Sequence, residues 1–434
     1  MALDHDMLVV EDVVEPRLSF NLKVLYITMV VYCAAAVCGP SFGHLVIGSA
    51  ARYAAVPLVV VCLLTHRRVP GLKVNWATIG IYGVTTLSLL SYFWSIQPSA
   101  TLSRSSTFIQ LFIASGALGL GLRTLRRQGV QAIAIGMMIG AIIAALLVFK
   151  ASRDHTFVGA NAFGNLIQRV SAGSADPNET ALSMAVALPI FIYHRKLLVK
   201  VGIIPVFIAI LLTGSRGGLI AAIVGFIALL LIPVLARRST SQNKRRGLQT
   251  WGGALLALFA YFVGAKILPT GVAARFQEIP AQLLGGTLSN RTILWSTGWH
   301  GFLLHPIHGF GAGTAPYYLS VTAGYDSPTH NTYLSFLLEL GLLGWSCFMF
   351  ATIAGVLGAV RLGPQIPWLL PSLVTLLVGI YALSWEYSKV LWILLILGGY
   401  ALSISRLGQE QRLASPGMPL PTPHRASTPA AHLE

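Results

Sequence analysis

The sequence predicts an all-α polytopic membrane protein of about twelve transmembrane helices, with one large loop outside the membrane. Two properties of the chain support this fold class. Its 434 residues are 55% hydrophobic and only 10% charged, whereas soluble domains carry about 25% charged residues. Several apolar runs also reach about 20 residues, the length that a helix needs to cross the hydrocarbon core.

The apolar runs and the turn signals between them place each expected span. The sixth and seventh spans are short for a bilayer, so one of them is expected to be tilted, broken or extended into its loop. The spans are expected at residues 21–38, 45–64, 75–94, 105–122, 130–149, 180–194, 199–213, 217–236, 249–268, 330–357, 367–384 and 388–405.

This layout divides the chain into five parts. An acidic tail at 1–20 carries no cleavage site of a signal peptide and precedes nine spans at 21–268, which include an outside loop at 150–179. A large outside loop at 269–329 is too long for a plain connection and is expected to carry function. Three spans follow at 330–405, and the tail at 406–434, rich in Pro, Ser, Thr and Ala, is expected to be disordered.

The distribution of basic residues orients the chain. The net charge is +16, but the basic residues stand in short clusters between apolar runs, which argues against nucleic-acid binding. Of the 30 Lys and Arg residues, 20 fall on the side of the two termini and 10 on the other side. The positive-inside rule therefore places both termini in the cytoplasm. It leaves the outside cations as candidates for function, since topology does not require them.

The cysteines point to no special chemistry. Cys33, Cys38, Cys62 and Cys347 all lie in apolar runs. We interpret them as small core residues that form neither a disulfide framework nor a metal site.

The end of the first outside loop carries a helix-start signal. Asp176 has the character of an N-cap, Pro177 takes the first helical position and Glu179 the third. We therefore interpret the two acidic residues first as structural.

A second helix start stands at the outer end of the seventh span. Ser215 is expected to cap the next helix, with Arg216 in its first turn and glycines at 214, 217 and 218. A cation at a helix N-terminus is unfavourable unless an anion binds there to the backbone N–H groups and the guanidinium. The alternative is an arginine that reaches toward lipid headgroups.

The large loop repeats this arrangement. Ser289 and Asn290 are expected to cap a helix over 291–304 that starts with Arg291. Its apolar residues recur at helical spacing and predict an amphipathic helix on the outer membrane surface. A headgroup contact is again the alternative role for Arg291. The recurring apolar residues are Trp295, Trp299, Phe302 and Leu303.

The third helix start precedes the tenth span. Thr329 is expected to be the N-cap, which would put His330 in the first turn of the helix. The partial positive charge of a helix N-terminus lowers the pKa of a histidine, and a neutral imidazole can accept a proton. The alternative is a histidine that only hydrogen-bonds locally.

Together, two planar cations and a neutral base suit a diphosphate-linked substrate. Guanidinium groups can neutralise a diphosphate leaving group without a metal, and the histidine can deprotonate an attacking hydroxyl. No metal site is expected, because the histidines at 300, 305, 308 and 330 form no H-E-x-x-H motif. The glycine-rich run at 305–313 is expected to let the loop fold back over a site. Glu386 and Lys389 either pair with each other or help to hold an acceptor.

Three stretches carry a resemblance to a known family: TGSRGGLIA at 213–221, NRTILWSTGWHGFLLHPIHGFGAG at 290–313 and HNTYLSFLLELGLLG at 330–344. With the twelve-span layout, the chain resembles the lipopolysaccharide O-antigen ligases, within the O-antigen ligase/polymerase superfamily. The resemblance implies an inner-membrane enzyme of the glycosyltransferase-C type. It would transfer a glycan from undecaprenyl diphosphate to a hydroxyl of lipid A–core at the periplasmic face, without a metal or other cofactor.

The resemblance also assigns roles to residues. Arg216 and Arg291 would bind the donor diphosphate, and His330 would be the base of an inverting displacement. Asn331, Glu386 and Lys389 are candidates for supporting or acceptor-binding roles.

Three alternatives stay open. An O-antigen polymerase or a protein O-oligosaccharyltransferase of the same superfamily would differ only in the acceptor. A secondary transporter of an anionic solute would also place cations near the ends of short, glycine-interrupted spans.

Overall fold

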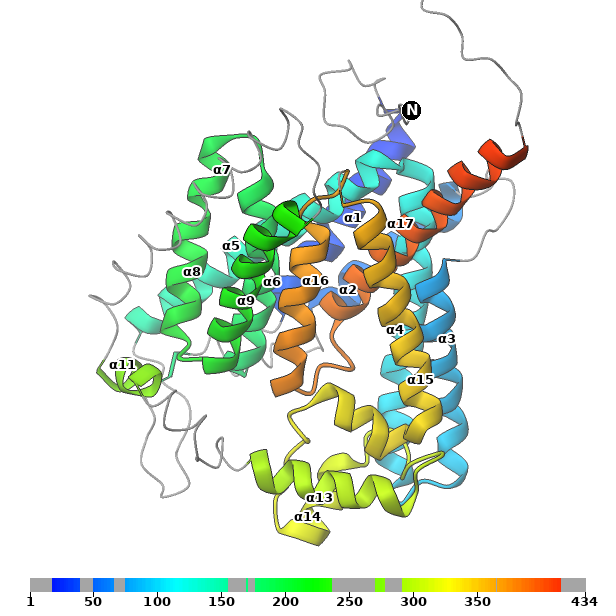
Figure 1. Ribbon diagram of the computed structural model, residues 1–434, viewed down its shortest axis with the longest axis vertical. Helices are drawn as coiled ribbons and strands as arrows, with labels where there is room; N and C mark the ends of the chain where they lie inside the picture. Colours follow the sequence, from blue (N-terminus) through cyan, green and yellow to red (C-terminus); the bar gives the residue numbers. More distant parts are fainter. Residues whose placement is uncertain are drawn as a thin grey trace, which may run out of the picture.

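The computed structural model describes residues 18–39, 50–65, 75–154, 169–170, 176–235, 270–277, 291–363 and 365–414. In these residues the chain is a bundle of helices with two further helices beyond one end of the bundle (Figure 1). The bundle consists of α1 (Phe20–Cys38), α2 (Ala50–Thr65), α3 (Trp76–Leu90), α4 (Pro98–Leu125), α5 (Arg127–Arg153), α6 (Pro177–Tyr193), α7 (Leu197–Val201), α8 (Ile203–Leu212), α9 (Arg216–Leu235), α15 (Thr332–Arg361), α16 (Leu369–Gly379) and α17 (Lys389–Ala414). The other elements are the short helices η4 (Ser91–Phe93) and η5 (Ile380–Ala382), α11 (Thr270–Gln277), α13 (Arg291–Leu304) and α14 (Ala315–Ala323).

Eleven of the twelve expected spans coincide with helices, and the ninth, at 249–268, lies outside the described residues. Among the described residues, four helices are long and apolar enough to cross a membrane: α1, α4, α5 and α15. Five shorter apolar stretches accompany them. The helical, membrane-type fold is thus confirmed, and the number of spans stays a prediction.

The two short spans behave differently from each other. The sixth is extended into its loop, because α6 starts at Pro177, next to Asp176. The seventh is divided at Gly202 into α7 and α8. At the other end of the chain, α17 continues to Ala414, beyond the expected end at 405.

Close helix packing depends on glycine at several crossings. α15 packs along α17, and a Cβ at Gly358 would overlap the carbonyl oxygen of Gly398. α1 packs along α5 in the same way, since a Cβ at Gly140 would overlap the carbonyl oxygen of Ala34. Small residues at such positions let helix backbones approach closely within a membrane. The four cysteines are free, as expected, and three of them are buried in this packing.

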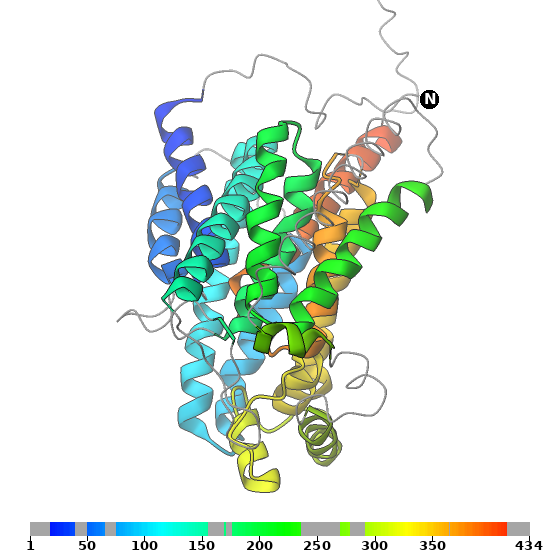
Figure 2. The same cartoon turned by 90° about the vertical axis from the view of Figure 1, so that its left-hand side faces the viewer.

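α13 and α14 lie beyond one end of the bundle, beside the first half of α15 (Figures 1 and 2). The expected helix over 291–304 is confirmed, and its position on the membrane surface stays a prediction. Gly298 and Gly301 face Leu334 and Leu338 of α15, while Trp299 is 48% exposed. Glycine allows the helix backbone to approach α15, so the glycine face packs there and part of the aromatic face points outward.

α15 is broken at Gly341, within the span that the sequence predicts as continuous. Gly341 has φ 61° and ψ −162°, a combination that only glycine adopts without strain. Residues 306–311, within the glycine-rich run at 305–313, fill the break. This run therefore folds back onto the bundle, as the sequence predicts. At the end of the first half of the helix, Phe310 N–H donates to Leu338 O (3.0 Å) and Gly311 N–H to Glu339 O (2.8 Å).

The same run caps the second half of the helix. Leu342 N–H donates to Pro306 O (2.8 Å) and Leu343 N–H to Ile307 O (3.2 Å). An unpaired backbone group is costly in an apolar environment, so a break in a membrane helix is stable only where other groups replace the lost hydrogen bonds. The loop and α15 therefore depend on each other, and the loop is held at the end of the bundle where α15 begins.

Candidate functional site

The segment before α15 corrects one expectation. The N-cap is Asn331 and not Thr329, because the Asn331 side chain accepts the N–H of Leu334 (3.1 Å). Thr329 is buried and holds the loop instead: its hydroxyl lies 2.7 Å from Ser335 Oγ and 3.3 Å from Ser384 Oγ. The helix therefore begins at Thr332, and His330 stands in the turn before it.

His330 is held in an unusual conformation in this turn. Its φ is 49°, in the left-handed region that non-glycine residues seldom adopt and that is often found at functional sites. Its Nε2 lies 3.2 Å from Ser327 Oγ. Burial lowers the pKa of His330, the charge of Arg291 lowers it further, and Asp176 opposes the shift. The neutral imidazole that the sequence predicts is thus supported, with burial and not a helix dipole as its main cause.

Arg216 lies where the sequence places it, in the first turn of α9. Ser215 Oγ accepts the N–H of Gly218 (3.1 Å), so the expected N-cap is confirmed. The same hydroxyl donates to Asn178 Oδ1 (2.9 Å), which joins the start of α9 to the start of α6. Asp176 caps α6, also as expected, by accepting the N–H of Asn178 (2.8 Å). Two helix starts therefore meet at this point.

Arg169 belongs to the same place and is missing from the expected site residues. Its Nη2 donates to Asn178 Oδ1 (2.8 Å) and its Nε to Thr213 O (3.4 Å). Burial lowers the pKa of Arg169, and the charges of Arg291 and Arg216 lower it further, whereas Asp176 raises it. One signal in the sequence marks it, since it is one of the ten cations on the outer side of the expected layout.

Arg291 starts α13, and its charge acts on both His330 and Arg169. α13 is also tied directly to the turn of His330, since Trp295 Nε1 donates to Thr329 O (3.0 Å). The expected caps at 289 and 290 lie outside the described residues. The structure thus brings Arg291 close enough for its charge to act on His330, and Arg216 and Arg291 close enough for their charges to act on Arg169.

The three remaining candidates have different surroundings. Asn331 has the structural role of a helix cap. Glu386 is 4% exposed, and burial followed by the charge of Glu339 raises its pKa, with Arg104 opposing the shift. Lys389 lines a small cavity with Arg52 and Gln110. The charge of Glu179 acts on both Glu386 and Lys389, but neither of the two acts on the other. Of the two roles left open for them, pairing with each other therefore gains no support.

The arrangement offers two kinds of chemistry side by side. The charges of Arg216, Arg291 and Asp176 all act on Arg169, and those of Arg291 and Asp176 also act on His330. Such a group of planar cations suits a multiply charged anion such as a diphosphate. Beside it stands an imidazole whose lowered pKa keeps it neutral, and therefore able to accept a proton, near pH 7.

Comparison with known proteins gives a family match. Residues 201–349 match the family model described as O-antigen ligase. The match includes Arg216, Arg291, His330 and the first part of α15. No curated protein matches the chain.

Proposed function

We propose that this chain, whose residues 201–349 match the O-antigen ligase family model, transfers an O-antigen glycan from undecaprenyl diphosphate to a hydroxyl of lipid A–core. The reaction would take place on the periplasmic side of the bacterial inner membrane. The observation that supports the proposal is a continuous set of charge interactions: Arg216 and Arg291 act on Arg169, and Arg291 acts on the buried His330, whose pKa is lowered. It pairs a diphosphate-binding group with a base.

The proposed reaction is a single displacement. The acceptor hydroxyl oxygen attacks the anomeric carbon of the donor sugar while the bond from that carbon to the diphosphate oxygen breaks. The hydroxyl proton passes to a ring nitrogen of His330, and the guanidinium groups neutralise the charge that grows on the diphosphate. The configuration at the anomeric carbon is inverted. If Nε2–H donates to Ser327 Oγ, Nδ1 carries the lone pair that takes the proton.

A transfer assay in detergent with EDTA tests this function. Undecaprenyl-diphosphate glycan is incubated with purified protein, with and without lipid A–core. We expect product only with lipid A–core. Elongated glycans without that acceptor would identify a polymerase, and no glycan product under any condition would overturn the proposal in favour of a transporter.

Arg216→Ala is expected to raise the KM for the donor by about 10-fold or more, because a charge-assisted hydrogen bond is worth about 1.5–3 kcal/mol. Arg216→Lys is the matched control, and it should recover part of this loss because it keeps the charge without the fork geometry. An unchanged donor KM in Arg216→Ala would remove this residue from the diphosphate site.

The acid side of the pH profile gives a separate prediction. Activity requires neutral His330, so kcat/KM should fall only below the ordinary histidine pKa of about 6.5. Arg291→Gln removes a charge that lowers the pKa of His330. It should therefore move the acid limb of the profile, the pH range in which kcat/KM falls, to higher pH. Asp176→Asn removes a charge that raises this pKa but keeps an N-cap residue, and should move the limb to lower pH.

The sign of the two shifts checks the assignment, since they act in opposite directions on one group. Arg291→Lys is the control and should leave the limb in place. Shifts in the same direction, or none in either variant, would mean that a group other than His330 sets the acid limb.

A further inference from the structure

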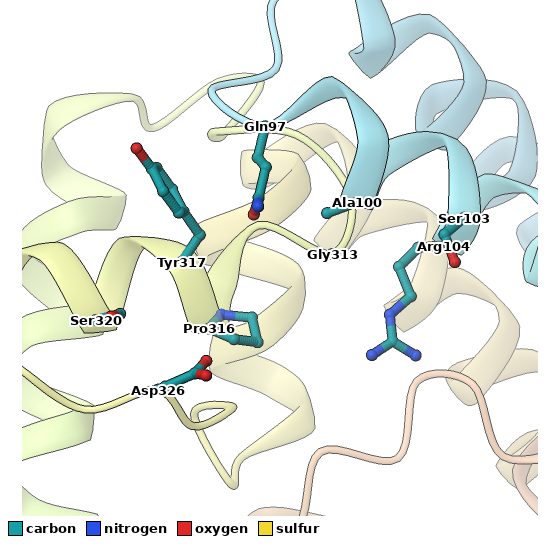
Figure 3. Close-up of a pocket in the computed structure, with 9 residues that line it drawn as sticks. All are labelled: Gln97, Ala100, Ser103, Arg104, Gly313, Pro316, Tyr317, Ser320 and Asp326. Carbon is teal, nitrogen blue, oxygen red and sulfur yellow. The ribbon is translucent and has the colours of Figure 1, made fainter.

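A polar cavity of about 440 Å³ lies at the same end of the bundle, between the start of α4 and α14 (Figure 3). Gln97 extends from the start of α4 toward the segment of Gly313, Arg104 extends from α4 past that segment, and Pro316 and Tyr317 lie on α14 across from them. Arg169, Arg216 and Arg291 do not line it. Its polar side chains are Gln97, Ser103, Arg104, Tyr317, Ser320 and Asp326.

The position of Arg104 is built into the fold. Its guanidinium lies over the ring of Tyr387, 4.7 Å from the ring centroid. Tyr387 Oη in turn donates to Glu339 Oε2 (3.2 Å). Glu339 is 5% exposed and also accepts the N–H groups of Gly313 (2.7 Å) and Ala315 (3.3 Å). A chain of contacts from α15 through the turn before α17 thus holds Arg104 at the cavity.

Gly313 completes this construction. Its φ is 75°, in the left-handed region, and a Cβ at this position would overlap the Arg104 side chain. Glycine is therefore required at this position for two reasons: it adopts the backbone turn, and it leaves the space that Arg104 occupies. The cavity wall would change with any other residue there.

The lining suits a sugar. The amide of Gln97 both donates and accepts hydrogen bonds, Asp326 accepts, Arg104 donates, and Ser103 and Ser320 do either. Sugar hydroxyls need this mixture, since each donates and accepts. The ring of Tyr317 offers an apolar face to the C–H groups of a sugar. A volume of about 440 Å³ lies within the range of small-molecule sites.

The same lining disfavours the other parts of the substrates. A lipid chain would bury the polar groups of Gln97, Arg104 and Asp326 without hydrogen bonds, which is costly. A diphosphate would meet one arginine together with the carboxylate of Asp326, which repels it.

The chain links the cavity to the proposed base. Asp326 lines the cavity, the next residue, Ser327, contacts His330, and only three residues separate Asp326 from His330. Even fully extended, this segment spans no more than roughly 14 Å, a length that a few sugar units bridge. An acceptor hydroxyl must come within hydrogen-bond reach of the base. In an inverting displacement it also approaches opposite to the leaving diphosphate, and hence from a side other than that of the three arginines.

We propose that the cavity between α4 and α14 binds a sugar of the acceptor glycan and so directs the acceptor hydroxyl to His330. This proposal rests on the proposed function for the reaction that follows binding. Binding itself is independent of the reaction and can be measured alone.

The first test is binding of the delipidated core oligosaccharide to the full-length His330→Asn protein in detergent, followed by isothermal titration calorimetry. We expect Arg104→Ala, Asp326→Asn and Tyr317→Ala, each added to this background, to weaken binding at least 10-fold. Thr322→Ala is the matched control, because Thr322 is exposed on α14 and does not line the cavity. Unchanged binding in all three variants would overturn the proposal, whether or not the protein proves to be a ligase.

The second test uses initial rates in the otherwise native protein. The same three variants should raise the KM for lipid A–core at least 10-fold and leave the KM for the donor unchanged. A rise in the donor KM alone would assign the cavity to the donor glycan and overturn the acceptor assignment. If the unmutated protein shows no transfer while the His330→Asn protein binds the core oligosaccharide, the result contradicts the proposed function. It does not contradict the assignment of the cavity.

Discussion

Replacement of His330 by alanine is expected to lower kcat for glycan transfer by about 10²- to 10⁴-fold, the usual contribution of a general base. The reason is specific to this turn. The imidazole has a lowered pKa next to Arg291 and is oriented by Ser327, so it is neutral when the acceptor hydroxyl must lose its proton. Binding of the donor should persist, because the three arginines remain. Transfer kinetics and donor binding measured on the same preparation check both statements.

The backbone at His330 calls for a second variant. With φ at 49°, alanine is strained there, whereas asparagine tolerates the left-handed region. His330→Asn therefore removes the base without adding strain, and should lose as much activity as His330→Ala. His300→Ala is the control, since His300 is exposed on α13. Transfer near the native rate in His330→Asn would remove His330 from the mechanism.

Replacement of Gly341 by alanine is expected to destabilise the folded protein by about 2–6 kcal/mol. One part is backbone strain, because φ 61° with ψ −162° belongs to glycine. The other part is overlap, because a Cβ there would meet the backbone of Ile307. The overlap would push the glycine-rich run out of the break in α15 and leave backbone groups of Leu342 and Leu343 without partners. Thermal unfolding in detergent measures the loss.

Two other glycines separate the two contributions. Gly324 also has a left-handed φ, of 74°, but a Cβ would meet nothing within 4 Å, so Gly324→Ala should cost only the strain, about 1–2 kcal/mol. Gly116 lies inside α4 and is equally open. Gly116→Ala should therefore stabilise the helix by about 0.5–1 kcal/mol. If Gly341→Ala unfolds at the same temperature as Gly324→Ala, the contact between the loop and the break contributes no stability.

The elements that the sequence predicts well are those controlled by local physics. The caps at Ser215 and Asp176 are confirmed because a short polar side chain reaches only the backbone N–H groups two or three residues ahead. The cap of α15 is wrong by two residues for a related reason. Thr329 and Asn331 can both cap a helix, and the choice depends on Ser335 and Ser384, which bind the Thr329 hydroxyl.

The break at Gly341 is beyond local prediction. The segment is apolar and reads as one span, and nothing near Gly341 in sequence shows that carbonyl groups at 306 and 307 replace its lost helical partners. The contact between α13 and α15 is likewise beyond local prediction, because Gly298 and Gly301 pack against Leu334 and Leu338, which are distant in sequence.

By itself, the sequence determined the helical membrane fold, the order of the helices, and that Arg216, Arg291 and His330 stand at or next to helix starts. Each follows from composition, period or a cap within a few residues. Only the tertiary structure decided that Arg169 joins them, that His330 is neutral chiefly through burial, and that Glu339 and Tyr387 hold Arg104 at a second cavity. These features arise between residues far apart in the chain, and their energies depend on distance and burial, which exist only after the helices have packed.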